Sequence, residues 1–268
     1  MNKTIGFIGC GNMGKAMVEG IMKAKLIKGE QMIVSNAHPE KLQDLSNLYD
    51  FYIGDNESVA CNADILFLAV KPYMYKEVID EIREVVKEDV IIVDIAAGIE
   101  LKDIYAMFHK PLKAVKAMPN TPALVGEAMS ALAFGELLEA EEREAIIEIF
   151  ESFGRCCEVK ETLMGAVTAV SGSSPAYIFM VIEAMADGAV LAGMPRKDAY
   201  FFAAQAVLGS AKMVLETGKH PGELKDMVCS PGGTTIEAVA KLEEYGLRNA
   251  LLQGMKACIE KNQAMTRK

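Results

Sequence analysis

The chain begins with short apolar runs that alternate with longer stretches in which apolar residues recur every three or four positions. The short runs are rich in Val and Ile and predict strands. They are Thr4–Ile8, Met32–Ser35, Asp64–Val70, Val90–Ile95 and Lys113–Ala117. The amphipathic stretches predict helices. They are Lys15–Lys25, Pro39–Leu48, Tyr75–Val86 and Leu101–Phe108. Regular alternation of strand and helix predicts a doubly wound α/β domain with a parallel sheet.

The pattern changes near Glu161. Two further apolar runs, Ser130–Phe134 and Arg155–Val159, flank the helical stretch Ala140–Phe153 and are expected to extend the same sheet. Beyond them the chain predicts only helices, separated by glycine and proline. We therefore expect residues 1–161 to form an α/β domain and residues 162–268 to form an all-helical domain.

The helical half has apolar residues on more than one side of its long segments, for example Ala176–Leu191 and Ala199–Leu215. A domain of about 100 residues buries that much apolar surface poorly by itself. The pattern favours a homodimer formed through these helices and assembled into a higher homo-oligomer. A compact helical bundle in a monomer is the alternative.

Composition narrows the classes of partner. The sequence has 28 Lys and Arg against 37 Asp and Glu, a net charge of −9, which would repel a nucleic-acid backbone. The first residues lack the pattern of a secretory signal, and the apolar run Ala176–Ile182 is followed by Glu183 and Asp187. We expect no nucleic-acid partner, no membrane span and a cytoplasmic location. The spacing of the six cysteines and three histidines suggests no metal site.

Three glycines follow the first predicted strand directly. Gly9, Gly11 and Gly14 have the GxGxxG spacing, and the helix Lys15–Lys25 comes next. In this context Gly9 permits a tight turn, Gly11 lets the backbone approach a pyrophosphate, and Gly14 lets helix and strand pack closely. The phosphates would lie at the helix N-terminus. This predicts a Rossmann-type dinucleotide site.

The end of the second strand bears on which dinucleotide binds. Many NAD-binding sites carry an acid there that binds the ribose hydroxyls. This sequence instead has Ser35, Asn36, Ala37 and His38. Ser35 and Asn36 can donate hydrogen bonds to a 2′-phosphate, and His38 or Lys41 could add positive charge. NADPH is therefore favoured, although no arginine is present and NADH is left open.

Further motifs lie at the predicted carboxyl ends of strands, where open α/β sheets bind ligands. They are Leu68–Pro72, Ala96–Gly98 and Met118–Pro122. With Val167–Phe179 and Cys229–Thr235 of the helical half, they closely resemble pyrroline-5-carboxylate reductases along the whole chain. The Ser-Pro-Gly-Gly-x-Thr element is the most discriminating of them. The resemblance implies NAD(P)H-dependent reduction of L-1-pyrroline-5-carboxylate to L-proline.

The resemblance also assigns positions. It implies cofactor contacts at Ile8, Gly9, Cys10, Gly11, Asn12, Met13, Ser35, Asn36, Asn56, Ala69, Val70, Lys71, Pro72, Ala96, Ala97 and Gly98. The glycine motif adds Gly14, and a nicotinamide placed against Met118–Asn120 adds Asn120. The resemblance implies substrate contacts at Glu161, Ser230, Gly232, Gly233, Thr234 and Thr235. Two positions depart from the pattern. Ser174 replaces a frequent glycine, and Met227 stands where some relatives have asparagine.

The glycines Gly232 and Gly233 precede the predicted helix Ile236–Leu242, so backbone N–H groups can converge on an anion such as a substrate carboxylate. From the residues alone, an ordinary helix cap is an equal alternative. If the imine binds already protonated, hydride transfer needs no strong acid. We expect catalysis chiefly by positioning, with Thr235 as the group that orients the ring nitrogen.

Two other readings of the sequence remain. A 3-hydroxyacid dehydrogenase shares the glycine motif and the two-part architecture, but it typically uses a lysine at the start of the helical part. The segment SGSSPAYIF at residues 171–179 has none. A catalytically silent NADP-sensing protein would be indicated by an altered loop at residues 230–235, and this loop is intact.

Overall fold

The structure is a computed structural model that describes residues 1 and 3–266. The chain divides into two compact units. The first comprises Met1–Ser173 together with the residues from Cys258 onward, and the second comprises Ser174–Ala257.

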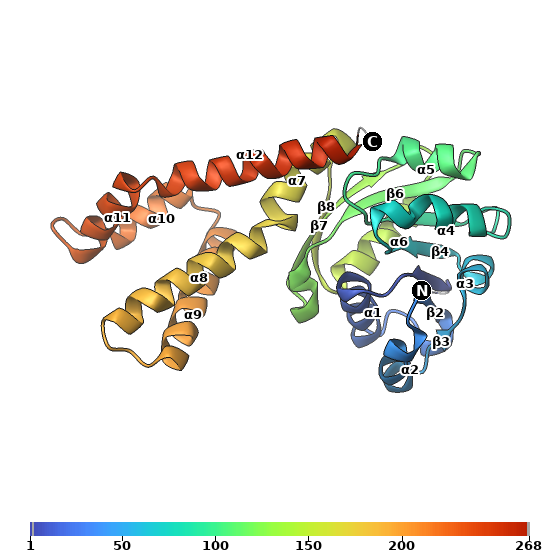
Figure 1. The fold of residues 1–268 in the computed structure, drawn as a ribbon, viewed down its shortest axis with the longest axis horizontal. Helices are drawn as coiled ribbons and strands as arrows, with labels where there is room; N and C mark the ends of the chain where they lie inside the picture. The colour runs from blue at the N-terminus through green and yellow to red at the C-terminus, as the bar shows by residue number, and fades with distance from the viewer. Residues whose placement is uncertain (2, 267–268) are drawn as a thin grey trace. The chain divides into compact units, whose positions relative to one another are not determined.

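The first unit contains one eight-stranded sheet (Figure 1). Its strands are β1 (Ile5–Ile8), β2 (Met32–Ser35), β3 (Tyr52–Ile53), β4 (Ile65–Leu68), β5 (Ile91–Asp94), β6 (Lys113–Met118), β7 (Ala128–Phe134) and β8 (Gly154–Glu158). Their order is β3-β2-β1-β4-β5-β6-β7-β8, and all neighbours pair in parallel except β6 and β7. The first six strands have the Rossmann order. The expected doubly wound sheet is confirmed, and the two later runs do extend it.

Helices cover both faces of this sheet (Figure 1). Those of the first unit are α1 (Asn12–Lys23), α2 (Gln43–Tyr49), α3 (Asn56–Asn62), α4 (Tyr75–Ile82), α5 (Leu101–Phe108), α6 (Ala140–Glu151) and α7 (Met164–Val167). Buried residues of α1, α2 and α6 belong to one hydrophobic core, and those of α3, α4 and α5 belong to another. The two cores lie on opposite faces because successive side chains of a strand point to opposite sides.

Two close packing contacts fix the strands next to the glycine loop. Phe7 of β1 and Phe67 of β4 are fully buried, and their rings stack with centroids 4.4 Å apart. On the other face, a Cβ added at Gly6 would lie 2.8 Å from Ala63 Cβ and 2.8 Å from Val59 Cγ1. Glycine at this position therefore lets α3 pack directly against β1.

Two elements were absent from the expectations drawn from sequence. β3 has only two residues, which is too short for a periodic signal. α3 has seven residues, NESVACN, with little apolar periodicity, but Asp55 caps it by accepting a hydrogen bond from Ser58 N at 2.8 Å. α1 begins at Asn12, three residues before the start that the hydrophobic pattern predicted.

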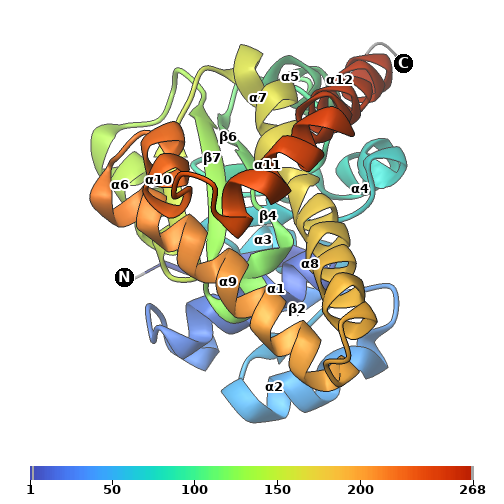
Figure 2. The same cartoon turned by 90° about the vertical axis from the view of Figure 1, so that its left-hand side faces the viewer.

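The second unit is helical, as expected. It contains α8 (Ser174–Leu191), α9 (Arg196–Thr217), α10 (Pro221–Val228), α11 (Thr234–Glu244) and most of α12 (Leu247–Thr266). α8 and α9 form a helical hairpin, joined through Ala192–Pro195 (Figures 1 and 2). A π-helical turn at Thr168–Gly172 precedes α8.

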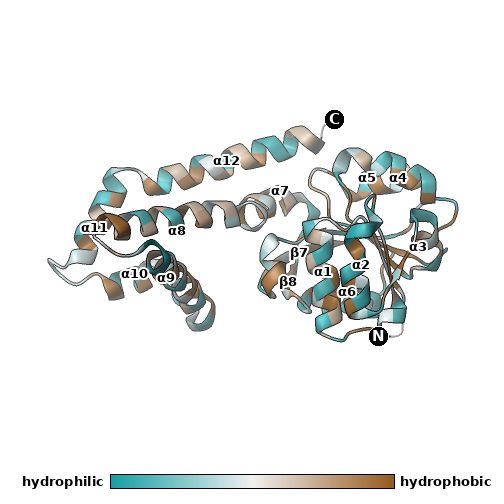
Figure 3. Cartoon of the chain, turned by 60° about the horizontal axis from the view of Figure 1, so that its bottom comes forward, coloured by the Kyte–Doolittle hydropathy of each residue, from teal (hydrophilic) through white to brown (hydrophobic). Residues whose placement is uncertain are grey.

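The second unit buries few apolar side chains within the chain itself. Across residues 174–257, all of which the structure describes, the buried hydrophobic residues are Ala186, Ala199, Ala203 and Leu224. Large apolar side chains are exposed along the hairpin, among them Phe179, Phe201, Phe202, Leu208 and Leu215. Apolar segments are visible on α8 and α11 in Figure 3. Exposed apolar area of this kind is typical of an interface.

One helical segment, Glu161–Leu191, is long and apolar enough to cross a membrane, judged by length and composition alone. The expectation of no membrane span did not take this segment into account. It considered only the run Ala176–Ile182, whereas residues 162–182 carry no Asp, Glu, Lys or Arg. The core helix of a soluble protein can meet the same criterion, so it does not by itself indicate a membrane.

Candidate nucleotide and substrate sites

The glycine loop connects β1 to α1. Gly9 has a φ of +90°, and a Cβ added there would lie 2.8 Å from the Ala69 backbone. A Cβ added at Gly14 would lie 2.8 Å from the Gly9 carbonyl oxygen. In contrast, a Cβ added at Gly11 would meet no heavy atom within 4 Å other than those of its immediate chain neighbours. Two of the glycines are thus needed for packing, and the third leaves open space at the N-terminus of α1.

A cavity of about 950 Å³ lies against this loop. Most of the predicted cofactor contacts line it, namely Ile8, Gly9, Cys10, Gly11, Asn12, Met13, Gly14, Ser35, Asn36, Asn56, Ala69, Val70, Lys71, Pro72, Ala96 and Ala97. All of them except Asn56, the first residue of α3, lie at or after the carboxyl ends of β1, β2, β4 and β5, which meet at one edge of a parallel sheet. The fold therefore gathers segments that are far apart in sequence around one site.

Two predicted cofactor residues do not line this cavity. Gly98 lines a second one, described below. Asn120 is 7% exposed; its Nδ2 donates to the Ser171 carbonyl oxygen at 3.0 Å, and its Oδ1 accepts from Met129 N at 2.9 Å. The Asn120 side chain thus connects three backbone segments, and its contact with a cofactor stays a prediction.

A chain of hydrogen bonds crosses the end of the cavity next to β2. The Ser35 hydroxyl donates to Asn56 Oδ1 at 2.7 Å, and Asn56 Nδ2 donates to Glu81 Oε2 at 2.7 Å. Glu81 comes from α4 and lines the cavity, as does Asp55. The sequence places no acid at the end of β2, but the fold brings two carboxylates there from other elements.

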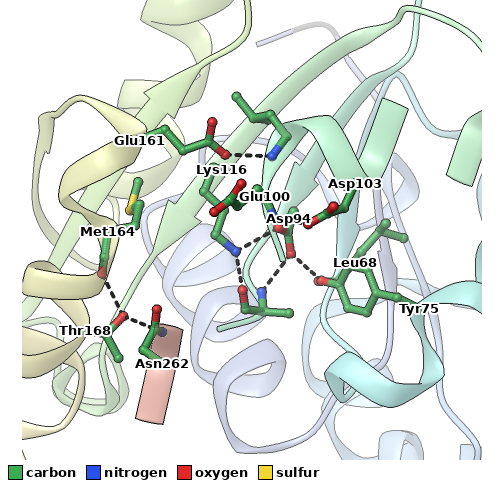
Figure 4. Close-up of polar contacts among 12 residues, drawn as sticks. Leu68, Tyr75, Asp94, Glu100, Asp103, Lys116, Glu161, Met164, Thr168 and Asn262 are labelled. Atoms are coloured by element: carbon green, nitrogen blue, oxygen red, sulfur yellow. Dashed lines mark hydrogen bonds and ion pairs between the residues drawn. The ribbon is translucent and has the colours of Figure 1, made fainter. Parts of the chain in front are cut away.

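A buried polar network lies under the turn Ala96–Gly98 (Figure 4). Asp94 Oδ1 accepts from Ala96 N at 2.8 Å and lies 2.6 Å from the Tyr75 hydroxyl. Asp94 Oδ2 lies 2.7 Å from the Lys116 ammonium, which also donates to the Ala96 carbonyl oxygen. The network therefore holds the first residue of the turn through both its N–H and its C=O.

Burial decides the protonation state of Tyr75. The side chain is 1% exposed, and burial, reinforced by the Asp94 carboxylate, holds the pKa of Tyr75 well above its usual range. Its hydroxyl stays protonated and lies within hydrogen-bond distance of Asp94 and of the Leu68 carbonyl oxygen, 2.7 Å away. Tyr75 thus connects the carboxyl ends of β4 and β5.

A second cavity of about 600 Å³ in the same unit includes Gly98, Lys116 and Glu161 in its lining. Glu161 Oε1 accepts a hydrogen bond from Leu101 N at 2.6 Å, which satisfies the first backbone N–H of α5 (Figure 4). Asn262 of α12 also lines this cavity, and its Nδ2 lies 3.5 Å from Thr168 Oγ1. The predicted role of Glu161 toward a substrate stays a prediction.

The loop Ser230–Thr235 lies in the second unit. Gly233 N donates to the Ser230 carbonyl oxygen at 3.0 Å, and Gly232 has a φ of +65°. Gly233 is the N-cap of α11, so Thr234 and Thr235 occupy its first turn. A Cβ added at Gly233 would lie 2.3 Å from Ser230 Oγ. The loop therefore presents the first backbone N–H groups of an eleven-residue helix, the arrangement that binds carboxylates.

Several residues of these sites were not found from the sequence. Glu81 and Asn262 lie on helices that are distant in sequence from the motifs that form the rest of each site. Lys116 was predicted to lie within a strand. Because lysine is seldom fully buried, nothing in the sequence indicated that it belongs to the site. For Asp55, the pair Asp55 and Ser58 around a helix start was the signal that could have been used.

Two models of known protein families match different parts of the chain. One described as NADP oxidoreductase, coenzyme F420-dependent, matches residues 4–98. One described as pyrroline-5-carboxylate reductase dimerisation matches residues 161–265. The first contains the glycine loop, and the second contains the Ser230–Thr235 loop and the exposed apolar helices.

Individual proteins match along the whole chain. The pyrroline-5-carboxylate reductase of Escherichia coli strain K12 is 48% identical over 268 residues, which cover 100% of both chains. The solved structure of a pyrroline-5-carboxylate reductase from Coxiella burnetii matches with a TM-score of 0.92 at 31% identity and covers 100% of both chains. The Plasmodium falciparum pyrroline carboxylate reductase, solved with NADP bound, matches with a TM-score of 0.91 at 30% identity, covering 99% of this chain and 98% of that one.

Proposed function

Because the chain belongs to the pyrroline-5-carboxylate reductase family, we propose that it reduces L-1-pyrroline-5-carboxylate to L-proline with NADPH. The observation that carries this proposal is the match at 48% identity over the full length, which includes both the glycine loop and the Ser230–Thr235 loop. In the reaction a hydride adds to the imine carbon. The ring nitrogen carries a proton and becomes the amine nitrogen of the product. The reduced nicotinamide supplies the hydride.

The cavity of the first unit is the proposed cofactor site. Its volume of about 950 Å³ is within the range of sites that enclose a nucleotide, and the space above Gly11 fits the approach of a pyrophosphate to the N-terminus of α1. The proposed contacts are Ile8, Gly9, Cys10, Gly11, Asn12, Met13, Gly14, Ser35, Asn36, Asn56, Ala69, Val70, Lys71, Pro72, Ala96, Ala97, Gly98 and Asn120. For Lys71, which precedes Pro72 in a short 3-10 turn, the backbone makes the proposed contact.

The proposed preference for NADPH over NADH rests on the end of β2. Ser35 and Asn36 line the cavity there, and neither carries a negative charge that would repel a 2′-phosphate. Both side chains have hydrogen-bond donors. NADH is the second cofactor that the site is proposed to accept.

The substrate is proposed to bind through its carboxylate. The loop of Ser230, Gly232, Gly233, Thr234 and Thr235 supports this because it presents backbone N–H groups at the start of α11. Glu161 is the proposed acidic contact. Thr235 is proposed to orient the imine nitrogen by a hydrogen bond. A substrate that binds with its nitrogen already protonated needs no strong acid from the protein.

The two parts of the chain have separate proposed roles. We propose that residues 1–161 form the dinucleotide-binding domain and that residues 162–268 form the substrate-binding and oligomerisation domain; the compact units divide later, since residues 162–173 and the residues from Cys258 onward belong to the first unit. The dimerisation model over residues 161–265 and the exposed apolar side chains of α8 and α9 support a homodimer, which we propose assembles further into a higher oligomer. We also propose a cytoplasmic location, without nucleic-acid or membrane partners.

The test is direct. Purified protein is mixed with pyrroline-5-carboxylate and either NADPH or NADH, and the loss of reduced nicotinamide is followed while proline is identified by mass spectrometry. Turnover with proline as product is expected, faster with NADPH at equal low concentration. Absence of turnover with both cofactors would contradict the proposal.

A further inference from the structure

Among the described residues that line the cofactor cavity, Glu81 is the acid whose side chain contacts a residue proposed to bind the cofactor, Asn56. It accepts the hydrogen bond from Asn56 Nδ2 at 2.7 Å, and Asn56 in turn accepts from the Ser35 hydroxyl at 2.7 Å. We infer that Glu81 sets how strongly the protein discriminates between NADPH and NADH, by fixing the orientation of Asn56 and Ser35. This inference deepens the proposed cofactor use and rests on the proposed nucleotide site.

The first step concerns the direction of the hydrogen bonds. A carboxylate accepts hydrogen bonds and donates none. The Asn56 carboxamide must therefore turn its Nδ2 toward Glu81, which leaves Oδ1 facing Ser35. Since Oδ1 also only accepts, the Ser35 hydroxyl must be the donor between these two residues. One charge on α4 thus determines where the proton of a buried hydroxyl on β2 points.

The second step concerns what remains for a ligand. A 2′-phosphate accepts hydrogen bonds, whereas the 2′-hydroxyl of NADH can also donate one. In the observed arrangement the only Ser35 O–H and one of the two Asn56 N–H groups are already used. Ser35 Oγ and the second Glu81 oxygen remain as acceptors. The arrangement therefore serves a ribose hydroxyl better than a phosphate.

The third step concerns charge. Among the described residues that line the cavity, Asp55 and Glu81 are acidic and Lys71 is basic. Asp55 Oδ1 already accepts from Ser58 N as the cap of α3, so Glu81 is the acid that acts on the Ser35–Asn56 pair. A phosphate with a charge near −2 is repelled by a nearby carboxylate, and a hydroxyl is not. Both effects of Glu81 weaken the preference for NADPH that the end of β2 otherwise favours.

The experiment compares Glu81→Gln with the wild-type enzyme. Glutamine keeps the size of the side chain, but it can donate as well as accept, so Asn56 is free to turn over and release donors. We expect the ratio of kcat/KM for NADPH to kcat/KM for NADH to rise by about three- to tenfold. Glu81 is exposed, so the variant is expected to fold, and its melting temperature checks this.

Glu77→Gln is the matched control. Glu77 is also exposed, lies one helical turn before Glu81 on α4, and is not part of the cavity lining. It removes the same charge without touching Asn56, so its ratio is expected to change by less than about twofold. Equal changes in the two variants would mean that the charge acts through space alone, and this result would overturn the proposed hydrogen-bond mechanism. An unchanged ratio in Glu81→Gln would overturn the inference entirely.

Binding measurements separate this inference from the proposed reaction. Calorimetric dissociation constants for NADP⁺ and NAD⁺ need no turnover. If wild-type protein binds both nucleotides but reduces no imine, the proposed function fails, and the ratio of the two constants in Glu81→Gln still decides the role of Glu81. A ratio that moves toward NADP⁺ supports the inference, and one that stays fixed contradicts it.

Discussion

The Lys116 ammonium and Asp94 Oδ2 lie 2.7 Å apart in an ion pair in which the two side chains are 2% and 1% exposed. The pair joins the last residue of β5 to the middle of β6 beneath the Ala96–Gly98 turn. A buried ion pair contributes little compared with a well-packed apolar pair, but the loss of one partner leaves an uncompensated charge in a medium that solvates it poorly. The position of the turn next to the cofactor cavity therefore depends on both residues.

Replacing Lys116 with Met is expected to lower the free energy of unfolding by about 3–5 kcal/mol, because Asp94 stays buried without its counter-charge. Urea denaturation measures this change. The exposed pair Lys76 and Asp80 on α4 provides the control, since Lys76→Met is expected to leave the unfolding midpoint near that of the wild type. The double variant Lys116→Met with Asp94→Asn should recover part of the loss. A double variant less stable than Lys116→Met would contradict the buried-charge explanation.

The thiol of Cys10 predicts a pH dependence. Burial raises the pKa of Cys10 from 9.0 to about 11, although the Lys15 charge opposes this. The folded state therefore keeps a proton that the unfolded state releases, and stability is fully present below pH 9 and is lost as the pH rises toward 11. At pH 10.5 the wild type should have lost about 2 kcal/mol more than Cys10→Ala, relative to pH 8. Parallel urea titrations at the two pH values measure this, and equal losses would refute it.

Gly11 and Gly14 should separate binding from folding. Gly11→Ala is expected to weaken NADPH binding by about tenfold or more, because the added methyl group occupies the space proposed for the pyrophosphate, while the melting temperature changes by less than about 3 °C. Gly14→Ala should weaken NADPH binding and also lower the melting temperature, since its Cβ would lie 2.8 Å from the Gly9 carbonyl oxygen. Calorimetry and thermal melts give the two quantities. Unweakened NADPH binding in Gly11→Ala would place the pyrophosphate elsewhere.

Thr235→Ala is expected to reduce kcat about tenfold and to raise the KM for pyrroline-5-carboxylate, because the hydrogen bond that we propose orients the ring nitrogen would be lost. The dissociation constant for NADPH should stay unchanged. Thr235→Ser keeps the hydroxyl and should restore most of the rate. If the alanine variant turns over like the wild type, Thr235 has no part in the reaction.

Phe202→Glu should dissociate the proposed dimer, because a charge then replaces an apolar side chain that is 63% exposed within one chain. Sedimentation velocity measures the change. Leu48→Glu on α2 makes the same type of substitution at a residue that is 69% exposed in the other unit, and the dimer should persist. Dissociation by both variants, or by neither, would argue against an interface that includes α9.

Strands that lie in the middle of the sheet were predictable because both faces are buried and the sequence is continuously apolar, as in β4 and in the first three residues of β5. β2 was predicted with both ends correct. β3 was not predicted, because two residues are too few to show a period, and they form a strand only by pairing with β2. The extension by β7 and β8 was predictable from composition, but the antiparallel direction of β7 follows from its connection to β6.

The site was predictable only where one local segment carries the signal. The glycine loop is such a segment, because its strand, turn and helix are consecutive. Glu81 lies 46 positions after Ser35 in the chain, and only the parallel order of β2, β1 and β4 brings the two onto one cavity. Lys116 is similar, since its burial depends on an aspartate from the adjacent strand. A contact between side chains of different helices or strands produces no periodic pattern in a single sequence.

The sparse interior of the second unit bears on how the protein is made. The first unit has extensive cores on both faces of its sheet, and their buried residues all lie between Ile5 and Phe153, so these cores can form before the rest of the chain is made. Residues 174–257 bury only four hydrophobic side chains within one chain. If a second copy completes their core, these helices reach their final packing only when two chains meet, and the concentration of newly synthesised chains then governs the yield of active enzyme.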